Sequence, residues 1–151
     1  MKLIVTVGLI ALTAMAATPG VATGAAFRVE EATIADIHKA LQNKQVTCRV
    51  IVQTYLDRIA AYDHKGSALA SILALNSKAL AEAKRLDADY ARSGPVGPLH
   101  CIPLVLKDNY NTADLPTTGG SASLAGAQPQ SDAFVVVQLR KAGAPWALNW
   151  E

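Results

Sequence analysis

The amino-acid sequence predicts an α/β fold in which helices alternate with a few short strands. Two observations support this fold class. Apolar residues recur at helical spacing in four stretches of the chain, and two mainly apolar runs, 69–75 and 102–106, have the length of strands. The 151 residues suffice for one domain or part of one, and neither an internal repeat nor a linker divides them.

The first 26 residues differ in composition from the rest of the chain. Lys2 is their only charged residue, an apolar run follows from Leu3 to Ala14, and small residues follow up to Ala26. This is the layout of a secretory signal peptide, and the apolar run is shorter than the ~20 residues of a membrane-spanning helix. We expect residues 1–26 to be a signal peptide with an open cleavage point; a retained N-terminal anchor is the alternative.

The expected signal peptide predicts that residues 27–151 are exported, either to the periplasm or out of the cell, without a stable membrane anchor. Export gives the two cysteines a possible role, because Cys48 and Cys101 could pair in an oxidising compartment. Disulfide geometry cannot be read from a sequence. We expect both cysteines to be buried and free, and a disulfide is the alternative.

The charge balance excludes some classes of partner. Lys and Arg number 14 and Asp and Glu number 12, which leaves a net charge of +2. A nucleic-acid arm or a polybasic membrane surface needs clustered Lys and Arg, and the sequence has no such cluster. We therefore expect no nucleic-acid partner.

Two helices are expected at the start of the exported part. Thr33 is a suitable N-cap, with Asp36 three residues later as its capping-box partner. Thr47 is a suitable N-cap for the second helix. The expected apolar stripes are Ile34, Ile37 and Leu41 in the first helix, and Ile51, Tyr55, Ile59 and Tyr62 in the second.

The middle of the chain predicts a strand, a helix and a second strand. Residues 69–75 form a strand closed by Asn76, and residues 77–92 are rich in strong helix formers. The run 102–106 is continuously apolar, which is typical of a strand buried on both faces, and it ends at Lys107. The inward side of the helix is expected to hold Leu80, Ala83, Leu86 and Tyr90.

A long loop and a final helix complete the expected elements. Residues 111–130 are mostly Thr, Gly, Ser, Ala and Pro, and long loops inside domains are usually functional. Ser131 is expected to cap the final helix and Gly143 to stand at its C′ position. The residues expected to face inward are Val135, Leu139 and Ala142.

Most common site motifs are absent from the sequence. His38, His64 and His100 are far apart and lack the spacing of metal ligands, so we expect no metal site. Neither a phosphate-binding glycine loop nor a nucleophile elbow occurs, and we expect no cofactor. His100 could be a base, but a single backbone hydrogen bond in a loop is the simpler role.

Lys107 has two interpretations because it ends an apolar strand. In the first, its aliphatic stem lies along apolar surface and its ammonium reaches water. In the second, poor solvation disfavours the charged form of the amine. A neutral lysine amine can then act as general base for a hydroxyl nucleophile without any histidine. A carboxylate of Asp108 facing the amine would instead favour its charged form.

The residues around Lys107 resemble a known family. The segment from Gly97 to Pro103, followed by Leu104 to Asn109, is similar to the core motif of the amidase signature enzymes. Further segments resemble parts of that family in the family's order, so that the resemblance covers roughly residues 31–144. These segments are 33–41, 46–59, 79–87, 116–121 and 132–144.

The resemblance implies the N-terminal part of the amidase signature fold, an incomplete mixed β-sheet covered by helices. It implies hydrolysis of carboxamide C–N bonds in small-molecule substrates by a Ser–cisSer–Lys mechanism. Lys107 would be the neutral base of that mechanism. The loop beside the substrate channel would contain Thr118, Gly119, Gly120 and Ser121.

The sequence departs from the family in three places. The segment that carries both family serines is expected after residue 151, while Ser121 and Ser123 belong to a different motif. Pro145 stands where a buried strand is expected, and a proline cannot donate to a strand ladder. Cys101 stands where the family usually has glycine, a residue that permits close backbone approach.

These departures separate the family from the activity of this polypeptide. We expect residues 27–151 to be an N-terminal fragment of an amidase domain, either truncated or frame-shifted, and inactive alone because the nucleophile is missing. The alternative is a non-catalytic exported helical module that binds a partner. The family's amidotransferase subunit that charges transfer RNA agrees poorly with a signal peptide and a near-neutral charge.

Overall fold

The computed structural model describes residues 27–150, the last five of them by their backbone only. The expected signal peptide lies outside these residues. None of the helices in the described part is long and apolar enough to cross a membrane. The elements in chain order are α1 (Ile34–Gln42), α2 (Cys48–Tyr62), β1 (Ile72–Leu75), α3 (Ala79–Ser93), β2 (Leu104–Lys107), the 3-10 turn η1 (Ala122–Leu124), α4 (Phe134–Lys141) and β3 (Trp146–Trp150).

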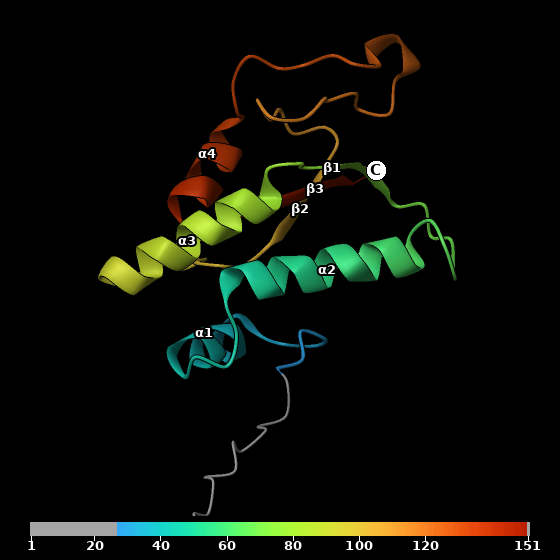
Figure 1. The fold of residues 1–151 in the computed structure, drawn as a ribbon. Coiled ribbons are helices and arrows are strands. Elements are labelled where there is room, and N and C mark those ends of the chain that lie inside the picture. Colours follow the sequence, from blue (N-terminus) through green and yellow to red (C-terminus); the bar gives the residue numbers. More distant parts are fainter. Residues whose placement is uncertain (1–26, 151) are drawn as a thin grey trace, which may run out of the picture.

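The three strands form one mixed sheet with the order β1-β3-β2 (Figure 1). β3 is antiparallel to β1 and parallel to β2, with Trp146 opposite Leu104. The sequence did not predict β3, because Pro145 stands where a strand was expected. The strand nevertheless forms, since it begins one residue after the proline and every paired residue keeps its N–H.

The predicted caps of the first two helices are confirmed. The Thr33 hydroxyl accepts the Asp36 backbone N–H at 3.1 Å, and the Asp36 carboxylate accepts the Thr33 N–H at 3.0 Å. The Thr47 hydroxyl accepts the Val50 N–H at 3.2 Å. The N-terminus of α2 gains a second cap from α3, where the Asp87 carboxylate accepts the Cys48 N–H at 2.6 Å.

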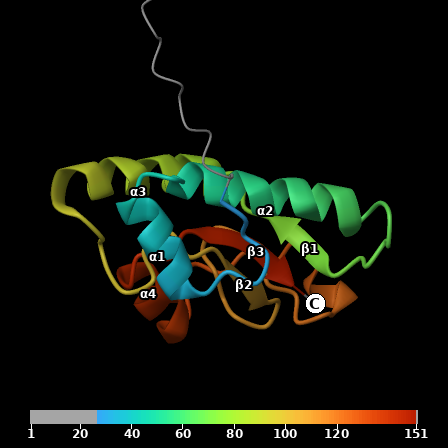
Figure 2. The ribbon, with the colours of Figure 1, turned by 90° about the horizontal axis from the view of Figure 1, so that it is seen from below.

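The main core lies between α1, α2 and α3, and α2 packs against α3 (Figure 1 and Figure 2). α3 buries its predicted side, with Ala83 and Leu86 inside and Leu80 and Tyr90 packed against them. The stripe predicted for α2 is correct at its start and wrong at its end, where Tyr62 is 51% exposed. The fully buried core side chains include Ile51, Val52, Cys48, Cys101 and Leu86.

A second, smaller core joins Leu106 of β2 to Val136 of α4. Two predictions are wrong here. β2 is buried on one face, because Val105 on its other face is 49% exposed. α4 starts after Ala133 and not at Ser131, and this later start buries Val136 and leaves Val135 40% exposed. Gly143 follows the C-cap residue with φ 89°, as predicted for a C′ glycine.

The segment before β2 lies in close contact with the end of α4. Leu99 donates its N–H to the Ala142 carbonyl at 2.8 Å, and Cys101 donates its N–H to the Gly143 carbonyl at 3.3 Å. A Cβ atom on Gly97 would stand 2.6 Å from the Ala142 oxygen. Only a glycine fits there, so this contact sets how β2 and α4 meet.

β1 is shorter than the predicted strand 69–75 because its start is held by a buried carboxylate. Asp63 accepts the N–H and the hydroxyl of Ser71 at 2.8 and 2.7 Å. Ala70 has φ 50°, which excludes it from a strand. The hydroxyl of Ser71 opposes the effect of burial and, with backbone N–H groups, lowers the pKa of Asp63.

The capping box predicts a measurable loss of stability. Thr33→Ala should lower the free energy of unfolding by about 1 kcal/mol, because the backbone N–H of Asp36 loses its side-chain acceptor. Thr54→Ala is the matched control: its hydroxyl bonds the Val50 carbonyl inside α2, where alanine is the better helix former. Urea unfolding should give a lower free energy of unfolding for Thr33→Ala than for Thr54→Ala. Equal losses in the two variants would contradict the stabilising role of the Thr33 cap.

Candidate functional site

Lys107 is the last residue of β2, and its side chain is exposed on the face of the sheet opposite α4. Strand alternation explains this position, because Leu106 points into the small core and its neighbour must point away. In the described part of the chain, Lys107 has no ion-pair partner. The amine is therefore available to a group that approaches this face.

Asp108 is turned away from Lys107 toward the loop. Its carboxylate is buried and accepts the Thr118 backbone N–H at 3.0 Å and the Thr118 hydroxyl. The Gly119 N–H donates to the Asp108 carbonyl at 2.9 Å. Burial acts to raise the pKa of Asp108, but the hydrogen bonds from Thr118 and the glycine N–H groups outweigh it and lower the pKa.

This bonding places the start of the loop beside the end of β2. Lys107, Asp108 and Asn109 face Gly119 and Gly120 across a cavity of about 170 Å³. Both glycines have positive φ angles, 58° and 77°, so the turn suits residues without a Cβ. A cavity of about 200 Å³ lies next to it and is lined by Asp108, by Leu73 and Ala74 of β1, and by Pro116 and Thr118 of the loop.

The structure thus brings together most of the residues singled out from the sequence. Lys107, Gly119 and Gly120 line one cavity, and Thr118 is fixed behind it by Asp108. Ser121 does not line that cavity, and its hydroxyl bonds the Ser123 hydroxyl at 2.8 Å. The roles assigned to these residues in catalysis and substrate binding remain predictions.

Arg140 of α4 joins the two ends of the loop. Its guanidinium pairs with Asp114 at 2.7 Å and Asp132 at 2.8 Å, near the two ends of the loop, and approaches Glu82 of α3 at 4.0 Å. Sequence reasoning missed this group because the three carboxylates come from separate segments. The network closes the loop that carries Thr118 against α4.

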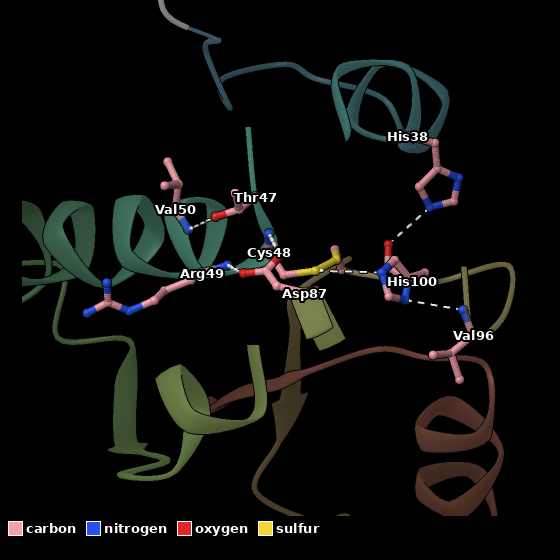
Figure 3. Close-up of a disulfide and its surroundings, with 9 residues drawn as sticks. His38, Thr47, Cys48, Arg49, Val50, Asp87, Val96 and His100 are labelled. Carbon is pink, nitrogen blue, oxygen red and sulfur yellow. Dashed lines mark hydrogen bonds between the residues drawn. A yellow bond between two sulfur atoms is a disulfide. The ribbon is translucent and has the colours of Figure 1, made fainter. Parts of the chain in front are cut away.

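A cluster of Cys48, His100 and Cys101 is buried away from the cavity, between α2 and the segment before β2 (Figure 3). The expectation of free cysteines is wrong, because Cys48 and Cys101 are joined in a disulfide, although both are buried as predicted. The sequence shows no Cys/His spacing of a metal site, yet His100 Nε2 lies 3.7 Å from Cys48 Sγ. The paired sulfurs offer no thiolate to a metal ion.

His100 makes the backbone hydrogen bond expected of it. Its Nδ1 accepts the Val96 N–H at 3.3 Å, and its ring stacks on Tyr90. The side chain of His38 contacts the His100 carbonyl at 3.1 Å. Burial, together with His38, lowers the pKa of His100, so its imidazole is neutral at neutral pH.

A family model described as "Amidase" matches residues 50–147. A Schizosaccharomyces pombe protein that bears the name of an amidase is 42% identical over 117 residues, 77% of this chain and 20% of that protein. A glutamyl-tRNA(Gln) amidotransferase subunit from Alkaliphilus metalliredigens is 40% identical over 117 residues, 78% of this chain and 23% of that protein.

Solved structures show the same likeness. Native peptide amidase from Stenotrophomonas maltophilia superimposes with a TM-score of 0.77 and 39% identity, over 80% of this chain and 25% of that one. An amidase family protein from Bacillus anthracis gives a TM-score of 0.77 and 31% identity, over 82% and 24%. This chain spans a quarter or less of the length of each of these proteins.

The bonding of Asp108 predicts a pH-dependent loop. Because the folded-state pKa is lowered from the ordinary 3.8, the carboxylate stabilises the loop above that pH and stops doing so as pH falls through the lowered value. The Thr118 amide signal in a nuclear magnetic resonance titration should therefore move with a midpoint below 3.8.

Asp108→Asn should remove this transition, because asparagine does not titrate. Asp57→Asn is the control, since Asp57 bonds Gln53 on the exposed side of α2 and should leave the transition in place. A midpoint above the ordinary value, or a transition that survives Asp108→Asn, would contradict the proposed bonding.

Proposed function

Because this chain belongs to the amidase family and has its fold, we propose that it forms part of a hydrolase of carboxamide C–N bonds. The family match includes β2, the long loop and α4, so it includes every residue of the cavity at Lys107. Small-molecule amides are the substrates proposed for the whole protein.

We propose a Ser–cisSer–Lys mechanism in which Lys107 is the base. A neutral Lys107 amine accepts a proton through a bridging serine while a second serine attacks the amide carbonyl. The proton then passes to the departing amine, and water releases the acid from the acyl-enzyme. The loop from Thr118 to Ser121 borders the channel by which the substrate arrives.

One observation supports this role of Lys107 above the others. The lysine side chain ends a strand, lines a cavity with two glycines, and has no ion-pair partner among residues 27–145. The neighbouring acid could have paired with it, but Asp108 is engaged with Thr118. If Lys107 served only to place a charge in water at the end of β2, no loop would have to be held beside it. The buried carboxylate of Asp108 nevertheless holds the loop there.

We propose that this chain by itself does not hydrolyse amides. Neither family serine occurs in its motif among the 151 residues, so covalent catalysis lacks its nucleophile. The exposed apolar side chains of the sheet, among them Leu73, Leu75 and Val105, agree with a fold that further polypeptide would cover. A monomeric, cooperatively folding chain of residues 27–151 would favour the alternative of a binding module.

We also propose that the protein is exported, to the periplasm or the exterior. The layout of residues 1–26 supports export. The disulfide between Cys48 and Cys101 supports it independently, because such bonds persist in oxidising compartments and are rare in the cytosol.

A chimera tests the role of Lys107. We would replace the matching segment of the Stenotrophomonas maltophilia peptide amidase with residues 27–144 of this chain and measure hydrolysis of a peptide amide. Lys107→Ala should lower kcat/KM by about 10²–10⁴, the usual contribution of a general base.

Lys84→Ala is the matched control for the chimera, because Lys84 is exposed on α3 and should be neutral. The unaltered chain of 151 residues should hydrolyse the same amide at background. Two results would contradict the proposal: a folded chimera without activity, and full activity after Lys107→Ala.

Fractionation of a bacterium that expresses the full chain tests export. The product should lie in the periplasm or medium and should have lost its leader, which N-terminal sequencing would show. Leu9→Arg with Ile10→Arg should keep it in the cytoplasm, because charges interrupt the apolar run. An uncleaved cytoplasmic product of the unaltered chain would refute export.

A further inference from the structure

Cys101 has a backbone conformation that disfavours its side chain. Its φ angle is 64°, in the left-handed region, and it lies three residues before the start of β2. A residue with a Cβ atom contacts the following carbonyl oxygen in this region, which lowers the folding equilibrium constant roughly tenfold relative to glycine. A cysteine at this position therefore needs a compensating interaction.

The surrounding backbone prevents the conformation from relaxing. The Cys101 N–H donates to the Gly143 carbonyl, and the preceding Leu99 N–H donates to Ala142 at the end of α4. On the other side of this contact, a Cβ atom on Gly143 would lie 3.2 Å from the Cα of His100. A change of φ at Cys101 would break the hydrogen bond to Gly143 or separate α4 from β2.

The side chain of Cys101 supplies the compensation. Its sulfur is bonded to Cys48, the first residue of α2, with a Cα–Cα distance of 4.9 Å and both residues fully buried. Figure 3 shows the bond between the start of α2 and the segment of His100. On the α2 side, the Cys48 backbone is held by the Asp87 carboxylate, so both ends of the bond are fixed.

We propose that the Cys48–Cys101 disulfide is required for the native turn before β2, so that the position of the Lys107 strand depends on oxidation of this pair. When the bond forms, each thiol loses one proton and one electron. Both electrons pass to an external small-molecule disulfide, which is reduced to two thiols. Reduced, Cys101 keeps its unfavourable backbone and loses the cross-link that offsets it.

The alternative use of this cluster is metal binding. The ligand atoms of Cys48, His100 and Cys101 lie within 4.8 Å of one another and are buried. The two sulfurs can act as metal ligands only when both are reduced, so the two uses exclude each other. All measurements below therefore contain a chelator.

The first experiment is urea unfolding of the full chain with and without a thiol reductant. Because the sulfurs are buried, the reductant must be present during both unfolding and refolding. The bond spans a sequence separation of 53 residues, and a cross-link of that span raises the folding constant on the order of 1,000-fold. A reduced chain as stable as the oxidised chain would overturn the proposal.

The second experiment separates the backbone effect from the cross-link. In the presence of reductant, Cys101→Gly should be more stable than Cys101→Ala, because only glycine is unstrained at this φ. Cys48 is the matched control: it begins a helix, so Cys48→Ala should be more stable than Cys48→Gly. If the alanine variant were more stable than the glycine variant at both positions, the Cys101 backbone would not be strained.

A glutathione titration keeps the proposal testable if the reduced chain does not fold. Linkage requires that the fold stabilise the disulfide by the same factor by which the disulfide stabilises the fold. The effective concentration of the thiol pair should therefore be on the order of 1,000-fold higher in buffer than in concentrated urea. Equal values in the two solvents would show that the bond and the fold are independent.

Discussion

The contact between the segment 97–101 and the end of α4 is the constraint on which the other parts depend. Two backbone hydrogen bonds and two glycines hold these segments at a separation that admits no Cβ atom. β2 leaves this contact from one side, and β3 leaves it from the other, so their parallel pairing begins here. The disulfide joins the same contact to α2, and thereby connects the helical core to the sheet.

Aspartate carboxylates hold the remaining irregular segments, and two of them, Asp63 and Asp108, are buried. Asp63 fixes the start of β1, Asp87 caps α2 from α3, and Asp108 binds the loop beside Lys107. Each accepts backbone N–H groups that regular secondary structure leaves unpaired, which a buried chain must satisfy. The loop position of Thr118 is therefore set by a hydrogen-bonded acid and not by packing, since the loop itself contributes little to the core.

Features that depend on neighbours in sequence could be predicted, and features that depend on distant segments could not. The caps at Thr33 and Thr47 and the C′ glycine at position 143 follow from local hydrogen bonding and backbone freedom. The sequence motif also located Lys107 and the glycines of its cavity. The pairing of Cys48 with Cys101 and the Arg140 network required three-dimensional contacts. β3 was likewise missed, because its partners β1 and β2 come from distant parts of the chain.

The central place of β3 has a consequence for the order of assembly. Of the three strands that the structure describes, the one made last lies between the two made earlier. Within residues 27–150, β1 and β2 therefore have no ladder partner until residues 146–150 have left the ribosome. The strand pairings join distant parts of the chain, and such pairings form slowly. Among the residues that the structure describes, the helices can therefore form before the sheet that they cover is closed.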